Sequence, residues 1–270
     1  AYGYDSGAAV GYGASGYNYG TAVGRSTRGY SYGAAVGCYA YGYDSGAAVG
    51  SYAYGYSSGA AVGHEAHGYS SGAAVGSYAK GMRGGAALGY KAGYNIDTGA
   101  DRYNIVIGYQ AGYSLTTGSR NIIIGVNTDL PSNSSSNMLS IGNLIYATGL
   151  SAFTSPTSAV STGNVGIGTS TPAAKLTVTA TGAAEHGAFI STATTSASYY
   201  ALDVRSGETS RLYVRADGKV GIGTTTPSQL LTVAGQCVTG DTALPIVSEI
   251  KNQISKIEFI QIKDIKGGEY

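Results

Sequence analysis

A 13-residue repeat limits what this chain can fold into more than any other feature of its sequence. The unit reads Gly-Tyr-x-x-Gly-Ala-Ala-Val-Gly-x-x-x-x, and its seven copies open at glycines from Gly3 to Gly81. A unit this short is too small for a helical-hairpin repeat and suits one turn of a narrow solenoid with two short strands. The recurring side chains are an aliphatic residue (Val10, Val23, Val36, Val49, Val62, Val75 and Leu88) and a tyrosine (Tyr4, Tyr17, Tyr30, Tyr43, Tyr56 and Tyr69).

Each unit contains the signals of a short strand between two corners. Strand geometry places Ala8 and Val10 on one face and Ala9 on the other. Gly7 and Gly11 flank this strand, where glycine adopts a corner conformation at low steric cost. The sequence therefore predicts an all-β fold, a parallel β-solenoid of 13-residue coils.

The repeat lengthens after Leu88. Gly93-Tyr-Asn-Ile-Asp-Thr-Gly and Gly112-Tyr-Ser-Leu-Thr-Thr-Gly are related by a longer step, and each leads to an Asn-Ile-x-Ile-Gly strand. The step from Gly93 to Gly112 predicts that the solenoid widens to 19-residue coils and that the repeat shaft covers residues 1–126. A polar linker with a short strand at 141–146 is expected within 127–162.

The narrow coils contain few large apolar side chains that could form a core. Burying a side chain of the size of Val stabilises a fold by at most about 1.5–3 kcal/mol. Ordering the backbone of one residue costs roughly 1–2 kcal/mol. One Val and a few Ala per repeat cannot offset that cost in an isolated coil, so we expect further burial from stacked Tyr, from neighbouring coils and from two other chains. The prediction is a homotrimer.

Composition excludes several classes of function. The 16 basic and 15 acidic residues nearly balance, which is atypical of nucleic-acid binding. No apolar run approaches the roughly 18–20 residues of a membrane span. Ala1-Tyr2-Gly3 matches Ala40-Tyr41-Gly42, so the chain begins inside a repeat and is expected to be a mature product or part of a longer protein.

The repeats resemble known fibres. Gly-Ala-Ala-Val-Gly resembles the head repeats of trimeric autotransporter adhesins, which implies a left-handed parallel β-roll and an intertwined homotrimer at the cell surface or outside the cell. Residues 108–125 are similar to repeats of phage and bacterial tail-fibre proteins. Gly163-Asn-Val-Gly-Ile-Gly-Thr-Ser-Thr-Pro172 recurs from Gly218 to Pro227 and resembles a tail-fibre-type β module, assigned to 163–236. Between the two copies, alternation over residues 200–215 predicts a β-hairpin.

The last segment has a different resemblance. Cys237-Val-Thr-Gly-Asp-Thr242 resembles the start of a Hint domain, the intein and hedgehog type of autoprocessing domain, so 237–270 is interpreted as a partial Hint-like segment. The resemblance implies that Cys237 attacks the Gln236 carbonyl to form a thioester, if the domain is completed beyond residue 270. The alternative is a short coiled coil with Val247, Ile250, Ile254 and Ile257 along its seam.

Other candidate sites are better explained by structure. His64, Glu65 and His67 lie in the variable corner of the repeat, and an exposed polar loop is favoured there over a metal site. Cys38 shares that corner and is interpreted as an incidental thiol. Asp5, Asp44 and Asp97 fit tight turns before glycine rather than a calcium pattern. We therefore expect no metal and no cofactor.

The function predicted from these features is that of a non-enzymatic extracellular fibre or adhesin stalk. Its partners are expected to be further copies of itself and, through outward-facing tyrosines, surface glycans or a host receptor. One alternative is a phage tail fibre on a virion. Another is a carrier for an autoprocessing Hint domain, with self-cleavage only at Gln236-Cys237.

Overall fold

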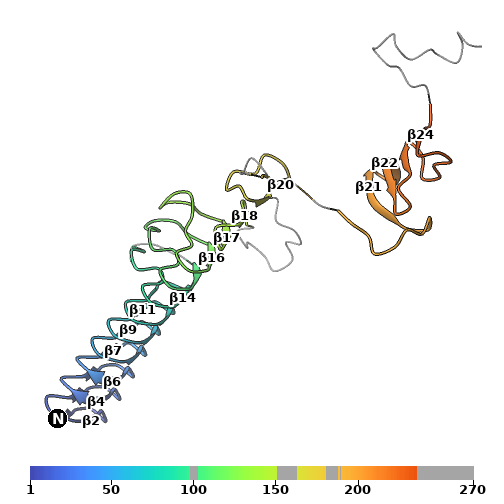
Figure 1. Cartoon of the computed structure of the whole chain (residues 1–270). Helices are drawn as coiled ribbons and strands as arrows, with labels where there is room; N and C mark the ends of the chain where they lie inside the picture. The colour runs from blue at the N-terminus through green and yellow to red at the C-terminus, as the bar shows by residue number, and fades with distance from the viewer. Residues whose placement is uncertain (98–102, 151–162, 181–187, 189, 236–270) are drawn as a thin grey trace, which may run out of the picture. The chain divides into compact units, whose positions relative to one another are not determined.

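The computed structural model describes residues 1–97, 103–150, 163–180, 188 and 190–235, and every regular element in these ranges is a β-strand. Strands of successive coils stack in parallel, which confirms the all-β solenoid (Figure 1). The chain divides into two compact units, residues 1–188 and residues 189–270. The first unit contains the whole solenoid.

Two parallel sheets form the narrow part of the solenoid, and each coil contributes one strand to each sheet. Paired residues occupy equivalent positions in successive repeats, as in the pairs Ala60 with Ala73 and Val62 with Val75. The first sheet contains β1 (Tyr2–Gly3), β3 (Ser15–Gly16), β5 (Arg28–Gly29), β7 (Tyr41–Tyr43), β9 (Tyr54–Tyr56), β11 (His67–Tyr69) and β13 (Lys80–Gly81). The second begins with β2 (Ala8–Val10), β4 (Thr21–Arg25), β6 (Ala34–Cys38), β8 (Ala47–Val49), β10 (Ala60–Val62), β12 (Ala73–Val75) and β14 (Ala86–Leu88).

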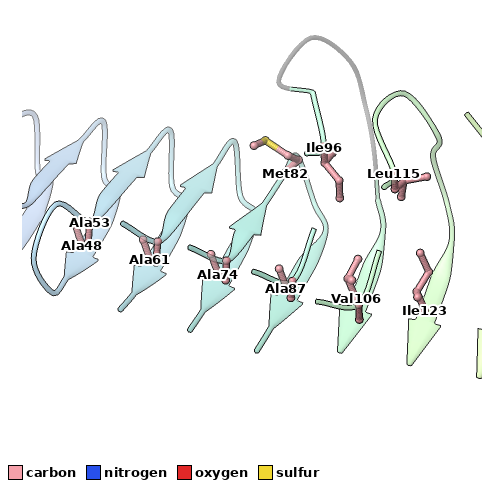
Figure 2. Packing of buried hydrophobic residues seen from close by; sticks show 14 of the residues in the cluster. Ala48, Ala53, Ala61, Ala74, Met82, Ala87, Ile96, Val106, Leu115 and Ile123 are labelled. Atoms are coloured by element: carbon pink, nitrogen blue, oxygen red, sulfur yellow. The ribbon is translucent and has the colours of Figure 1, made fainter. Parts of the chain in front are cut away.

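The interior between the two sheets is lined by alanine and glycine. Ala48, Ala61 and Ala74 point inward from the second sheet and are at most 1% exposed (Figure 2). The first sheet presents glycine opposite them, and a Cβ atom at Gly55 would collide with the backbone of Ala47. The two sheets therefore lie too close together for any larger side chain at these positions.

The repeated valines do not contribute to this interior, contrary to the burial argument made from the sequence. Val36, Val49, Val62 and Val75 are 43–45% exposed, because they alternate with the inward alanines and point away from the first sheet. The interior of a single chain therefore holds even less apolar surface than the sequence led us to expect.

Tight turns close each coil at one corner. Asp44 and Ser45 both have positive φ, 48° and 65°, and the Gly46 N–H donates to the Tyr43 carbonyl at 2.8 Å. These are the features of a type I′ turn, which reverses the chain over its two central residues. The Asp residue predicted to favour a turn before glycine is thus found in one.

Wider coils follow β14, and the first of their three steps has the expected 19-residue length whereas the next two are shorter. Ala86 pairs with Ile105, a 19-residue step, but Ile105 pairs with Ile122 and Ile122 with Leu139, both 17-residue steps. Their core is larger, and Figure 2 shows Val106 and Ile123 continuing the line of inward alanines. These strands are β15 (Ile105–Ile107), β16 (Ile122–Ile124) and β17 (Leu139–Ile141).

Parallel stacking continues beyond residue 126, where the shaft was expected to end, because β17 pairs in parallel with β16. Thr128 and Leu130 are buried, so the expected polar linker forms part of a further coil. The expected single strand at 141–146 is instead a hairpin of β17 and β18 (Ile145–Ala147), with positive φ at Gly142 and Asn143.

The two copies of the Val-Gly-Ile module adopt the same local arrangement. In the first, β19 (Val165–Ile167) pairs in parallel with β20 (Leu176–Val178), and in the second β23 (Val220–Ile222) pairs likewise with β24 (Leu231–Val233). The predicted hairpin is present as β21 (Tyr200–Ser206) and β22 (Thr209–Arg215). The boundary at residues 188 and 189 places the two copies in different units.

Candidate interaction surfaces

The outer face of the second sheet carries an exposed apolar stripe. Each of the seven strands β2, β4, β6, β8, β10, β12 and β14 contributes the first and third residue of its Ala-Ala-Val or related sequence, so that equivalent side chains from successive coils lie in register. Thr21 is the one polar residue in this series, and no charged residue interrupts it. We define the apolar stripe as Ala8, Val10, Thr21, Val23, Ala34, Val36, Ala47, Val49, Ala60, Val62, Ala73, Val75, Ala86 and Leu88.

The stripe continues onto the wide coils with larger side chains. Ile105 is 41% exposed and Ile141 is 38% exposed, both on the same face as the valines. A contiguous apolar surface of this length is unusual on an isolated soluble protein and is typical of an interaction site.

Stacked tyrosines cover the outer face of the first sheet. The rings of Tyr17, Tyr30 and Tyr43 are 4.8–4.9 Å apart and within 4° of parallel, as the spacing of stacked strands requires. Tyr4, Tyr56 and Tyr69 extend the same row at 4.8–5.6 Å between neighbouring rings. A second row on this face includes Tyr41 and Tyr54, 5.0 Å apart.

Two tyrosines of the first row, Tyr43 and Tyr69, are neutral hydrogen-bonding groups at ordinary pH. Burial raises the pKa of the Tyr43 phenol above its usual value, and the neighbouring Tyr56 and Tyr30 raise it further. Burial likewise raises the pKa of Tyr69. Arg28 lies over the Tyr41 ring, 5.4 Å from its centroid, so a cation is also accommodated on this surface.

The residues considered for a metal site do not converge. His64 and Glu65 form a pair with 3.4 Å between Nε2 and Oε1, both close to half exposed. His67 is directed away to the Tyr69 hydroxyl, with Nδ1 2.9 Å from the oxygen. No group of three His, Cys, Asp or Glu suited to a metal ion occurs among the residues that the structure describes.

The remaining sequence-derived candidates are placed as follows. Cys38 is a free, partly buried thiol at the end of β6. Cys237 and Gln236, together with the Hint-like segment and the alternative coiled-coil seam, lie outside the described residues. Within the described ranges, no helix has the length and apolar character needed to cross a membrane.

The alternation in the sequence placed the first alanine and the valine of each Ala-Ala-Val on one face of the strand, but it did not show that this face is the exposed one. Identical alanines at two adjacent positions left it undecided which of the two faces inward. The interruption by Thr21 was the available signal, since a polar residue fits the exposed position better than the closely packed interior.

Comparison of the chain with family models, with curated proteins and with solved structures finds no match.

Proposed function

We propose that this chain is the shaft of a non-enzymatic extracellular fibre or adhesin, in which three copies associate along the apolar stripe. The observation that carries the proposal is the apolar stripe, a row of uncharged side chains on one face of the solenoid. Its valines are 38–63% exposed in the single chain. Further copies of the same chain suit this surface, because parallel solenoids share one coil spacing and present matching stripes.

The thin interior supports the same conclusion. Alanine and glycine line the interior of the narrow coils, with Thr27 in the place of one alanine, and this core is too small to offset the conformational entropy lost in ordering each coil. Covering the stripe would supply the apolar burial that each chain lacks. The number three rests on the resemblance to trimeric adhesin heads, while self-association itself is supported by the exposed stripe.

Light scattering coupled to size-exclusion chromatography tests the proposal directly. The expected mass is three times that of the single chain, retained on dilution to low concentration. A stably folded monomer in dilute solution would overturn the proposal, whatever ligand the protein binds.

A fibre of this kind could be attached to a cell surface or to a virion. The recurrence of the Val-Gly-Ile and Leu-Thr-Val strand pair in both units favours the tail-fibre resemblance as a second candidate function. Electron microscopy of native material separates the two, because continuous or bundled filaments indicate a surface fibre and virion-attached trimers indicate a tail fibre.

A further inference from the structure

A cavity lies where the narrow coils give way to the wide ones, on the tyrosine-bearing side of the solenoid. Its volume is about 540 Å³, within the roughly 300–1,000 Å³ typical of small-molecule sites. His67 of β11 and Lys80 of β13 line it from the last strands of the first sheet, and residues 94–97 and 116–117 of the wide coils form its other side.

Hydrogen bonds hold this cavity in shape. The Lys80 ammonium donates to the Ile96 carbonyl at 3.3 Å, which ties the first wide loop to the end of the sheet. The Asn95 amide donates to the Tyr113 carbonyl at 2.8 Å, and the Asp97 N–H donates to the Thr116 carbonyl at 3.0 Å. Because these bonds connect the two wide loops to each other and to β13, the walls are largely pre-organised for a ligand.

The lining combines hydrogen-bonding groups of both kinds with aromatic rings. Glu65 and Asp97 contribute carboxylates, Lys80 an ammonium, and Thr117 a hydroxyl. Tyr78 and Tyr94 contribute rings whose centroids are 6.3 Å apart. Such a mixture suits a ligand that donates and accepts hydrogen bonds on one side and presents C–H groups on the other.

The charges of the lining narrow the ligand class. The carboxylates of Glu65 and Asp97 are balanced by the ammonium groups of Lys80 and of Lys91, which lies 5.4 Å from the centroid of the Tyr94 ring, so the site has no excess positive charge to attract a phosphate, a sulfate or an acidic sugar. Burial, and then the nearby Lys80, lower the pKa of His67, so this imidazole is neutral at pH 7 and adds no positive charge. The lining therefore favours a neutral ligand rich in hydroxyl groups.

We propose that this cavity binds a neutral saccharide unit of a surface glycan, held by His67, Lys80, Glu65 and Asp97 against the rings of Tyr78 and Tyr94. The site is built within one chain, so it does not depend on three-fold association. The proposal goes beyond that of a fibre shaft, because a shaft needs no ligand, and the two can fail separately.

Saturation-transfer NMR with the whole protein tests the site, using a panel of neutral hexoses and their oligosaccharides beside sialylated and sulfated glycans. We expect signal from one or more neutral saccharides and none from the anionic glycans. His67→Ser and Glu65→Gln are each expected to weaken binding by about tenfold, because the first removes a hydrogen bond of the imidazole and the second replaces a charged acceptor by a neutral one.

Arg28→Ser is the matched control. Arg28 occupies the repeat position of His67 in an earlier coil but does not line the cavity, and serine stands at that position in the coil before it, at Ser15. His67→Ser is equally compatible with the repeat, since Ser15 occupies that position in an earlier coil. Circular dichroism establishes that each variant is folded.

Three results would overturn the proposal: no neutral saccharide in the panel gives a signal, anionic glycans bind instead, or His67→Ser and Glu65→Gln bind as tightly as Arg28→Ser. A trimeric protein that binds no saccharide would refute saccharide binding in the cavity but not the proposed fibre shaft. A monomeric protein that binds a saccharide would refute the trimeric shaft but not the binding site.

Discussion

Replacing Val62 by lysine tests whether the apolar stripe is the surface through which the chains associate. Val62 is 44% exposed in the single chain. Complete burial of a valine contributes about 1.5–3 kcal/mol, so covering the exposed remainder contributes about 1 kcal/mol per chain, or about 3 kcal/mol over three chains. This term alone changes the association constant by roughly a hundredfold.

The lysine side chain also introduces a desolvation cost, which is larger in the assembly than in the single chain. A buried, unpaired ammonium costs several kcal/mol, and three of them would lie close together at the interface. In the isolated chain the same side chain reaches water, because position 62 lies on the outer face. If the proposed trimer forms through the stripe, Val62→Lys is therefore expected to dissociate it at micromolar concentration, while the strand pairing within a single chain remains geometrically possible.

Sedimentation velocity and light scattering measure the mass, and far-ultraviolet circular dichroism follows the strand content and the melting temperature. His64→Lys is the matched control, because it places the same charge in the same coil at a corner where Arg25 already stands. We expect the control to remain trimeric and Val62→Lys to become smaller and less heat-stable. A Val62→Lys protein with unchanged mass and melting temperature would refute the assignment of the stripe as the interface.

Three further predictions concern the interior and the pH response. Gly68→Ala should lower the free energy of unfolding by about 3 kcal/mol or more, because the added Cβ atom would meet the backbone of Ala60. Ser77→Ala is the control and should leave the free energy of unfolding nearly unchanged, as thermal unfolding of the two variants would show. Asn121→Ala should lower the free energy of unfolding by about 3 kcal/mol, since the Asn121 amide donates to the Ser135 carbonyl at 2.7 Å and accepts from the Met138 N–H at 3.0 Å. Denaturant unfolding measures this loss, and an unchanged midpoint would contradict it. The lowered pKa of His67 means that the unfolded chain binds a proton at this residue more readily than the folded chain, so the contribution of His67 to stability should be level just above pH ~6.5 and fall below it. The loss of melting temperature between pH 7.5 and pH 5 should therefore be smaller in His67→Ser than in the unsubstituted protein, and an equal loss in both would contradict this.

The repeat made the strands and their register predictable. A fixed period requires that Val62 lie beside Val75, and the pairing follows it at every narrow coil. The period does not state which face of the strand is inside, since alternation is the same for both choices. That decision depends on the distance between the two sheets, which the glycines of the first sheet make too short for valine.

The wide coils show a second limit of the sequence reasoning. The distance between Gly93 and Gly112 suggested a 19-residue coil, but these glycines lie in the loops and not in the strands. Asn104 and Asn121 are 17 residues apart and give the true strand register, because the side-chain oxygen of Asn104 accepts from the Asn121 N–H at 2.9 Å. The cavity could not be predicted at all, since it depends on how the loop at 94–97 folds over strands that precede it.

The layering of the narrow coils explains how one thin solenoid can hold both an assembly surface and a ligand site. The inner faces of the two sheets face each other across alanine and glycine, so their outer faces point in opposite directions. The apolar stripe lies on the outer face of the second sheet, and His67 and Lys80 line the cavity from the first. Self-association through the stripe would therefore leave the tyrosine rows and the cavity exposed to solvent. Because the interior is fixed by the repeat, residues on the tyrosine-bearing side can vary from coil to coil without disturbing assembly, and there the sequence does vary, from Ser15 and Arg28 to His67 and Lys80.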